Sequence, residues 1–190
     1  MSNERIGILI GPRGRGSNMA AIIDACQSGQ IPAAVDVVIA PNLESEAISA
    51  ARAKGIQVVT IEPANPDYPQ HLIEALQDVT VVCLAGYLRL LPVEVLRKFP
   101  GRVLNIHPAL LPKFGGKGMY GRHVHEAVLA SGDSESGASV HLVDERYDEG
   151  RVLVQRRCSV LPDDTPQSLA ARVLKEEHLA YVESLQRLLS

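Results

Sequence analysis

Short apolar runs rich in β-branched residues recur through the first hundred residues of this chain. The runs are RIGILI at 5–10, VDVVIA at 35–40, QVVTI at 57–61, TVVCLA at 80–85 and RVLNI at 102–106. Strands that helices cover on both faces have this nearly continuous apolar character. Helix-forming segments separate the runs. The alternation predicts an α/β fold, built on a doubly wound, mostly parallel sheet with right-handed crossovers.

Glycine and proline mark the ends of the predicted helices. These helices cover residues 17–28, 44–54, 69–77 and 92–98. Gly29 and Gly55 follow the first two, and a proline begins each of the other two. Glycine just past the last turn and proline in the first turn are the residues that helices favour there.

The pattern changes after Pro108. A glycine-rich loop at 114–121 leads into a predicted helix at 122–130. Strands are then predicted at 138–143 and 152–160, and a long amphipathic helix at 166–189 closes the chain. Because we find no repeat and no linker, we expect a single domain over 1–190 that divides near residue 107.

Composition argues against several classes of protein. The formal net charge is −3 with no block of like charge, so we expect no nucleic-acid partner. We also expect a cytoplasmic protein that does not bind membranes, since there is no signal-peptide pattern and no membrane-length apolar run. Cys26, Cys83 and Cys158 are far apart and odd in number. That spacing indicates reduced thiols, not disulfides.

The loop GPRGRGSN at 11–18 lies between the first predicted strand and the first predicted helix. Backbone N–H groups in such a turn, together with the helix N-terminus, attract anions. Ser17 and Asn18 stand where a nucleoside-triphosphate loop needs Lys followed by Ser or Thr. Gly16, Ser17 and Asn18 therefore fit a single phosphate monoester better. The alternative is that Ser17 only caps the helix.

The sequence Asn105-Ile106-His107-Pro108 ends a predicted buried strand. Alternation along a strand puts Asn105 and His107 on the same side, and proline ends the pairing. An amide and an imidazole at the carboxyl end of an α/β strand can donate hydrogen bonds to an oxygen that gains negative charge, as acyl transfer requires. The alternative is that both side chains only satisfy local backbone groups.

The segment Asp144–Gly150 between the last two predicted strands is the expected source of a carboxylate. Asp148 beside His107 would favour the protonated imidazole and fix its orientation. No serine or cysteine stands in a recognisable nucleophile motif, so we expect direct transfer without a covalent enzyme intermediate.

The remaining histidines give no metal site. His123 and His125 would point about 200° apart on a helix, so they would not bind one ion together. His141 alternates within a predicted strand, and we expect it to be a packed or capped core residue rather than a ligand.

Four motifs together resemble one enzyme family. They are GSN at 16–18, AGYLRLL at 85–91, NIHPALLP at 105–112 and DEG at 148–150. Their order and spacing resemble those of the folate-dependent phosphoribosylglycinamide formyltransferases of de novo purine synthesis, over essentially the whole chain. The resemblance implies a formyltransferase-like Rossmann-type fold, with a phosphate-binding half at about 1–107 and folate-binding loops plus the C-terminal helix at about 108–190.

The resemblance also implies roles for individual residues. Asn105, His107 and Asp148 would be catalytic, with His107 as the proton donor that Asp148 keeps charged. Gly16, Ser17 and Asn18 would hold the ribose phosphate, and Glu177 would bind the ribosyl-glycinamide part of the acceptor. The pterin pocket would be formed, largely through backbone groups, by Leu88, Arg89, Leu90, Leu91, Asn105, Asp144, Glu145, Arg146, Tyr147 and Asp148.

By the same resemblance, the substrates are small molecules: 10-formyltetrahydrofolate as co-substrate and glycinamide ribonucleotide as acceptor. No metal is implied, and we expect a monomer or a homodimer. Two alternatives stay open. The same fold could act on another amine acceptor or hydrolyse formylfolate, although such enzymes commonly carry an extra domain. A non-catalytic nucleotide-binding module would leave Asn105, His107 and Asp148 without a role.

Overall fold

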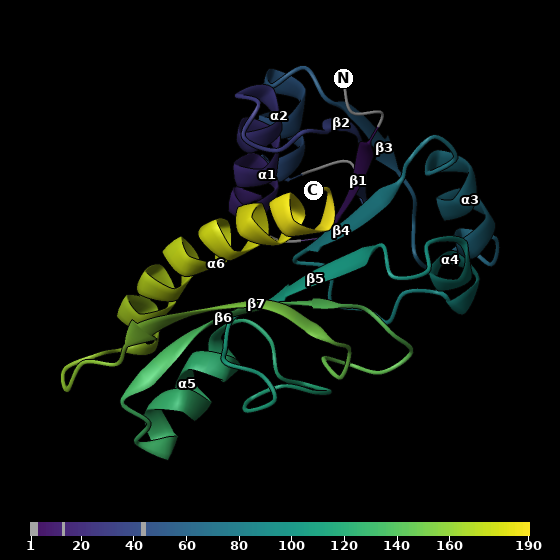
Figure 1. The fold of residues 1–190 in the computed structure, drawn as a ribbon. Helices are drawn as coiled ribbons and strands as arrows, with labels where there is room; N and C mark the ends of the chain where they lie inside the picture. Colours follow the sequence, from purple (N-terminus) through teal and green to yellow (C-terminus); the bar gives the residue numbers. More distant parts are fainter. Residues whose placement is uncertain (1–3, 13, 43–44) are drawn as a thin grey trace.

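The structure is a computed structural model that describes residues 4–12, 14–42 and 45–190. Within these residues, seven strands form one sheet in the order β3-β2-β1-β4-β5-β6-β7 (Figure 1). The strands are β1 (Arg5–Ile10), β2 (Ala34–Ala40), β3 (Gln57–Thr60), β4 (Val81–Ala85), β5 (Val103–His107), β6 (Glu135–Leu142) and β7 (Val152–Ser159). Strands β1 to β5 pair in parallel, and β6 runs antiparallel to both of its neighbours. The prediction of a mostly parallel α/β sheet is confirmed.

Helices cover both faces of this sheet. They are α1 (Ser17–Gln27), α2 (Glu46–Ala53), α3 (Tyr68–Ala75), α4 (Val93–Lys98), α5 (Arg122–Ser131) and α6 (Pro166–Leu188). Helices α1, α2 and α6 lie on one side of the sheet, and α3 and α4 lie on the other (Figure 1). Each predicted element is present. The largest shift is in β6, which begins at Glu135 rather than at residue 138.

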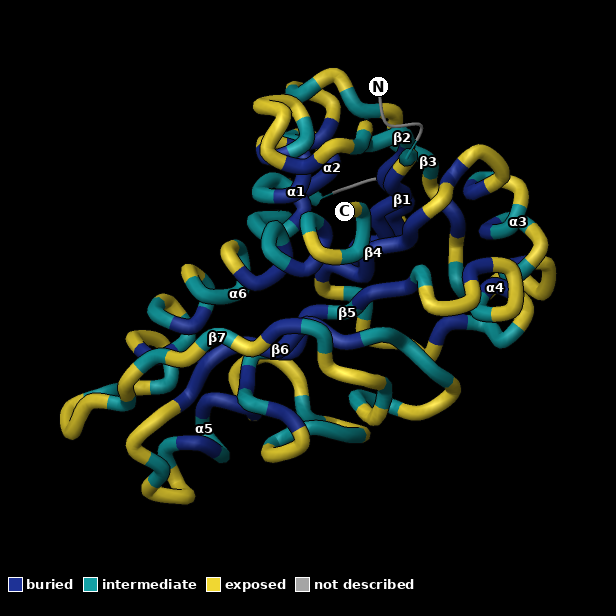
Figure 2. The backbone as a smooth tube through the Cα atoms, viewed as in Figure 1, coloured by how far each residue is buried: buried dark blue, intermediate teal, exposed yellow. Residues whose placement is uncertain are grey.

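Alternation along the strands builds two apolar layers. In β1, Ile6, Ile8 and Ile10 belong to the layer under α1, α2 and α6, whereas Leu9 belongs to the layer under α3 and α4. Figure 2 shows the inner strands β1, β4 and β5 as mostly buried and many outer helix turns and loops as exposed. Aliphatic side chains make up most of both layers, as the scarcity of aromatic residues requires.

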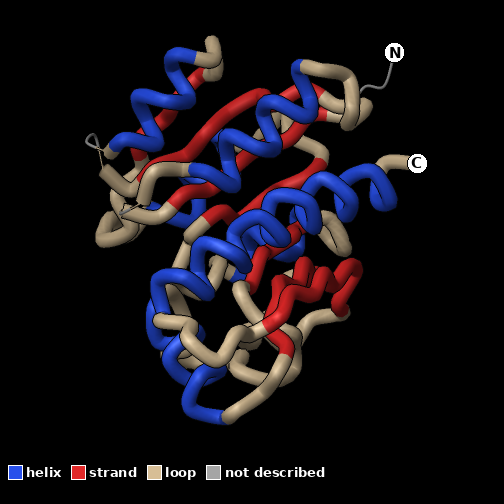
Figure 3. The backbone as a smooth tube through the Cα atoms, turned by 90° about the vertical axis from the view of Figure 1, so that its left-hand side faces the viewer, coloured by secondary structure: helices blue, strands red, loops and turns tan. Residues whose placement is uncertain are grey.

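The last helix extends along one face of the sheet (Figure 3). Helix α6 begins at a capping box, in which Thr165 accepts from the Ser168 backbone and the Ser168 side chain accepts from the Thr165 backbone. Tyr181 and Leu185 on its inner face are fully buried. Among the helices of the described segments, none has both the length and the apolar character that crossing a bilayer requires.

Candidate active site

A cavity of about 650 Å³ lies at the carboxyl ends of β4 and β5, a size typical of small-molecule sites. Parallel strands of doubly wound sheets commonly open a ligand site at this edge. Elements distant in sequence share its wall, which includes Asn18, Leu88–Leu91, Asn105, His107, Gly116–Gly121, His125, His141, Arg146–Asp148 and Glu177. The cavity thus joins the first helix, the β4 and β5 loops, the loop before β7 and the last helix.

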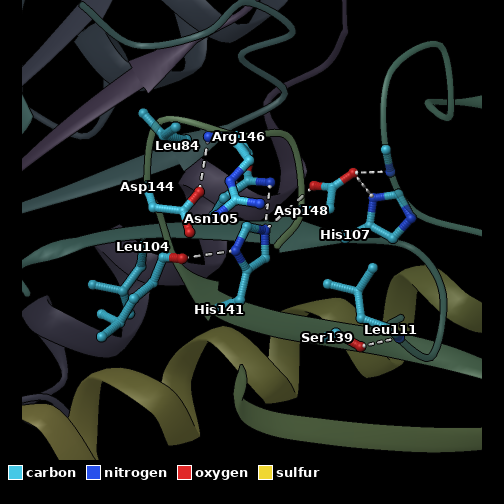
Figure 4. Close-up of polar contacts among 12 residues, drawn as sticks. Leu84, Leu104, Asn105, His107, Leu111, Ser139, His141, Asp144, Arg146 and Asp148 are labelled. Carbon is cyan, nitrogen blue, oxygen red and sulfur yellow. Dashed lines mark hydrogen bonds and ion pairs between the residues drawn. The ribbon is translucent and has the colours of Figure 1, made fainter. Parts of the chain in front are cut away.

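Asp148 lies between two histidines in this cavity (Figure 4). Its Oδ2 is 3.4 Å from His107 Nδ1, and its Oδ1 is 3.4 Å from His141 Nε2. The backbone N–H of Gly116 donates to Oδ2 at 3.0 Å. Each carboxylate oxygen therefore faces one imidazole, and the predicted approach of Asp148 to His107 is present.

His141 belongs to this cluster, and the expectation that it is a packed core residue misses that role. The antiparallel pairing of β5 with β6 puts His141 directly opposite Asn105. Their side chains meet at 3.2 Å, between Asn105 Nδ2 and His141 Nε2. His141 Nδ1 is 2.9 Å from the Leu142 carbonyl oxygen and must carry the proton that it donates there. In the neutral ring, Nε2 then accepts from the Asn105 amide.

His107 makes its second contact through the other ring nitrogen. Nε2 is 2.7 Å from the carbonyl oxygen of Phe114, so this nitrogen carries a proton. Burial lowers the pKa of His107, and the Asp148 carboxylate and the Phe114 carbonyl offset this only in part. The Asp148 carboxylate favours the charged ring and burial opposes it, so the charge that Asp148 would maintain on His107 stays a prediction.

For Asp148, the neighbouring groups outweigh the effect of burial on the pKa. Burial alone would raise it, but the contact with His141, the nearby His107 and the N–H of Gly116 together lower the pKa of this carboxyl below its usual range. Asp148 is thus ionised at neutral pH. Its φ is 57° and that of Phe114 is 58°, and among the described residues these are the two non-glycine positions with positive φ. Backbone strain is therefore concentrated at the site.

Gly150 lets the loop that carries Asp148 return to the sheet. A Cβ added at this position would lie 1.7 Å from the carbonyl oxygen of Leu142. Only glycine permits such a close approach of two backbones. The glycine therefore holds the loop against the end of β6, beside His141.

A separate polar pair lines the cavity from α1 and α6. The Asn18 side-chain amide donates to Glu177 Oε2 at 2.6 Å, across 159 positions of sequence. Burial raises the pKa of Glu177, and the bond from Asn18 opposes this only in part. The Oδ1 atom of Asn18 is buried and has no hydrogen-bond partner among the described residues.

The start of α1 leaves its backbone donors available. Gly16 is the N-cap, with a left-handed backbone at φ 71°, and no side chain caps the helix. The alternative role for Ser17, as a capping residue, is therefore wrong. Gly16 and Ser17 are not among the residues that line the cavity, whereas Asn18 is.

Comparison with known proteins agrees with this geometry. The model of the family described as "Formyl transferase" matches residues 5–185. The chain belongs to the formyl transferase family. It is 46% identical over 177 residues to the chloroplastic phosphoribosylglycinamide formyltransferase of Arabidopsis thaliana, covering 90% of this chain and 61% of that protein. The chain thus spans about three fifths of the length of that relative.

Two further relatives match over more of their own length. The phosphoribosylglycinamide formyltransferase of Escherichia coli is 37% identical over 174 residues, which is 88% of this chain and 80% of that protein. A crystal structure of glycinamide ribonucleotide transformylase 1 from Symbiobacterium toebii superposes with a TM-score of 0.89 at 37% identity, covering 98% of this chain and 88% of that one.

Two segments predicted for the pterin pocket differ in how they meet the cavity. Leu88, Arg89, Leu90 and Leu91 all line it, and Leu88 and Leu90 are about half exposed, at 51% and 46%. Of the later segment, Arg146, Tyr147 and Asp148 line it. Asp144 and Glu145 are not among the lining residues, and their role in the pterin pocket stays a prediction: Asp144 Oδ1 accepts from the Arg146 backbone, and Glu145 is exposed.

The cavity wall also includes His125, which was not among the residues predicted for the site. His125 is 5% exposed, and its Nδ1 finds no hydrogen-bond partner within the described part of the chain. His123, two residues earlier, is exposed and lies 3.7 Å from Glu126. The described residues contain no group of three or more side chains placed to hold a metal ion.

Proposed function

We propose that this chain transfers the formyl group of 10-formyltetrahydrofolate to the glycinamide amine of glycinamide ribonucleotide. One observation carries the proposal: Asn105, His107, His141 and Asp148 meet in the cavity that Asn18 and Glu177 also line. Formyl transfer needs hydrogen-bond donors, a proton-handling group and room for two substrates, and this arrangement supplies all three.

The reaction joins the acceptor nitrogen to the formyl carbon and breaks the bond from that carbon to N10 of the folate. The formyl oxygen gains negative charge in the tetrahedral intermediate. One N–H of the Asn105 amide is committed to His141, and the other is available to this oxygen. One proton leaves the amine and one reaches N10, so overall no proton is gained or lost.

His107 must change partners to assist. Its Nε2 proton is donated to the Phe114 carbonyl, and its Nδ1 faces Asp148. Donation to the formyl oxygen therefore requires the Phe114 backbone to move away from Nε2. The ionised Asp148 can accept a proton from the attacking amine, directly or through Nδ1 of His107.

Different parts of the cavity wall would bind different parts of the two substrates. The apolar segment Leu88–Leu91 suits a pterin ring, whose polar edge backbone groups can bind. Glu177 accepts a hydrogen bond from Asn18 and can accept another from a ribose hydroxyl or the glycinamide. Ser17 and the uncapped N–H groups of α1 would hold the phosphate, because a helix N-terminus favours an anion. The chemistry proposed for these residues needs no metal.

We further propose that the protein works in the cytoplasm, as a monomer or a homodimer. Cys26, Cys83 and Cys158 are all free thiols, as in proteins of reducing compartments. The Arabidopsis thaliana relative is named chloroplastic, so the compartment can differ among relatives.

The reaction is tested with purified protein, glycinamide ribonucleotide and the stable analogue 10-formyl-5,8-dideazafolate. Release of the deformylated folate is followed by absorbance, with and without acceptor. We expect release that depends on the acceptor and disappears in Asp148→Asn. Release without acceptor would instead favour a hydrolase, and no release from a folded protein would favour another acceptor or a binding module.

The matched control replaces a charged side chain on the same loop. Glu149 is exposed and pairs with Arg146 at the surface. Glu149→Gln should leave the transfer rate within about twofold, since surface ion pairs contribute little. Loss of activity in both variants would mean that the loop as a whole is needed, not the Asp148 carboxylate.

A further inference from the structure

Tyr181 is a fully buried side chain whose hydroxyl contacts the backbone of two strands. It lies on the inner face of α6 and has 0% exposure. Its hydroxyl is 2.8 Å from the carbonyl oxygen of Leu84 in β4 and 3.2 Å from that of Leu104 in β5. The single hydroxyl proton is shared between both oxygens, mainly with the nearer one.

These carbonyls lie where the two strands enter the site. The pairing of β4 with β5 ends at Leu84 opposite Asn105. The Leu104 carbonyl belongs to the peptide unit whose nitrogen is that of Asn105. The Leu84 carbonyl likewise belongs to the peptide that leads into the segment Leu88–Leu91. One hydroxyl thus contacts the backbone that supplies the catalytic amide and the backbone that leads to the proposed pterin pocket.

The direction of the contact is unusual. Carbonyl groups in a regular sheet point toward the neighbouring strand, within the plane of the sheet. Tyr181 instead belongs to the apolar layer between the sheet and α6, together with Leu104 and Cys83. The hydroxyl that arrives from this face contacts both oxygens, one of which belongs to the peptide unit that joins Leu104 to Asn105. The Asn105 side chain alternates to the opposite face from Leu104.

The hydroxyl is a permanent donor. Burial raises the pKa of Tyr181 far above its ordinary value, and the neighbouring Cys83 raises it further. Burial also raises the pKa of the Cys83 thiol. Both groups therefore stay protonated.

We propose that Tyr181 is a positioning residue of the formyl-transfer site, whose hydroxyl fixes the peptide units before Ala85 and Asn105 and so aims the Asn105 amide. The inference rests on the proposed function, because it assigns Asn105 the role of donor to the formyl oxygen. Tyr181 touches no substrate and acts only through the backbone of β4 and β5.

Tyr181→Phe tests the role, because it keeps the ring and removes only the hydroxyl. We expect kcat to fall about tenfold, as for a small misplacement of a catalytic group, while KM for the acceptor stays within about twofold. Ser184→Ala is the matched control: Ser184 lies one turn later and is buried, and its hydroxyl has no partner among the described residues. It should leave both constants unchanged.

A double-mutant cycle separates positioning from general loosening. In an Asn105→Ala background, Tyr181→Phe should change kcat by less than about twofold, since the group that it aims is gone. Losses that multiply in the double variant would overturn the proposal. So would a kcat for Tyr181→Phe within about twofold of wild type, or failure of this variant to fold when Ser184→Ala folds.

An NMR comparison keeps this inference distinct from the proposed function. In ¹⁵N-labelled protein, the backbone and side-chain amide signals of Asn105 should shift in Tyr181→Phe and not in Ser184→Ala. If the wild-type protein transfers no formyl group, the proposed function fails, and the Asn105 signals still decide the role of Tyr181. Unchanged Asn105 signals in Tyr181→Phe would overturn it.

Discussion

The parallel and antiparallel parts of the sheet contribute to the cavity in different ways. In the parallel part, Asn18 at the start of α1 lines the cavity, and one side-chain bond links it to Glu177 in α6. In the antiparallel part, β5, β6 and the loop before β7 bring together Asn105, His141 and Asp148 through direct side-chain contacts.

This difference indicates where the identity of a side chain should matter most for binding and turnover. If the start of α1 holds the phosphate through backbone groups, as proposed, binding there depends mainly on the path of the chain, so single side chains should contribute modestly. The antiparallel cluster shares protons among buried groups, and each of its members sets the pKa or the orientation of another. We therefore expect substitutions in the antiparallel cluster to reduce turnover strongly, and substitutions near α1 and α6 to weaken acceptor binding.

The largest effect is expected for His107→Ala. Removing a donor to the formyl oxygen should lower kcat by about 10²–10³-fold, because the charge that develops there loses a preorganised partner. Steady-state kinetics measures this, with His123→Ala as a control, since His123 is exposed on α5. Activity within about twofold of wild type would remove His107 from the mechanism.

His141→Ala should lower kcat by about thirtyfold, since it frees both Asn105 and Asp148 to move. It should also change the pH profile. The contact with His141 is the largest influence that lowers the pKa of Asp148, so its loss raises that pKa. Asp148 is then protonated at a higher pH, and the acidic limb of kcat moves upward in pH. An unmoved limb would show that Asp148 is not the group that titrates.

Glu177→Gln should raise KM for the acceptor by about tenfold and leave kcat nearly unchanged, because a charge-assisted hydrogen bond to substrate is lost.

The free energy of unfolding of Glu177→Gln should not fall, although substrate binding is weakened. Since burial raises the pKa of Glu177 in the folded state, the ionised carboxylate opposes folding above that pKa. Urea unfolding at pH 7 should find the variant at least as stable as wild type. A less stable variant would mean that the ionised pair with Asn18 stabilises the fold.

Ser17→Ala is expected to have the smallest effect. Its side chain makes no capping bond, so the free energy of unfolding should change by less than about 0.5 kcal/mol. KM for the acceptor should rise about threefold if the hydroxyl donates to the phosphate. An effect on kcat as large as that of His141→Ala would contradict the division between the two parts of the sheet.

The sequence alone determined much of the scaffold. Runs of β-branched residues, glycine after helices and proline at their starts reflect chemistry within a few residues, and β1 begins and ends where those rules predict. The shared side of Asn105 and His107 also follows from alternation along one strand. These features are local, so the pattern of the chain is enough to find them.

Only the tertiary structure decided how the site is completed. Nothing near His141 in the sequence indicates that β6 pairs with β5 in the register that puts it opposite Asn105. The pKa of His107 likewise depends on a balance between burial and one distant carboxylate, and the Phe114 contact depends on a positive φ. Strand partners, burial and loop docking are set by contacts between residues far apart in the chain. A short sequence motif therefore shows which side chains can take part in chemistry, but not which of them contact one another in the folded protein.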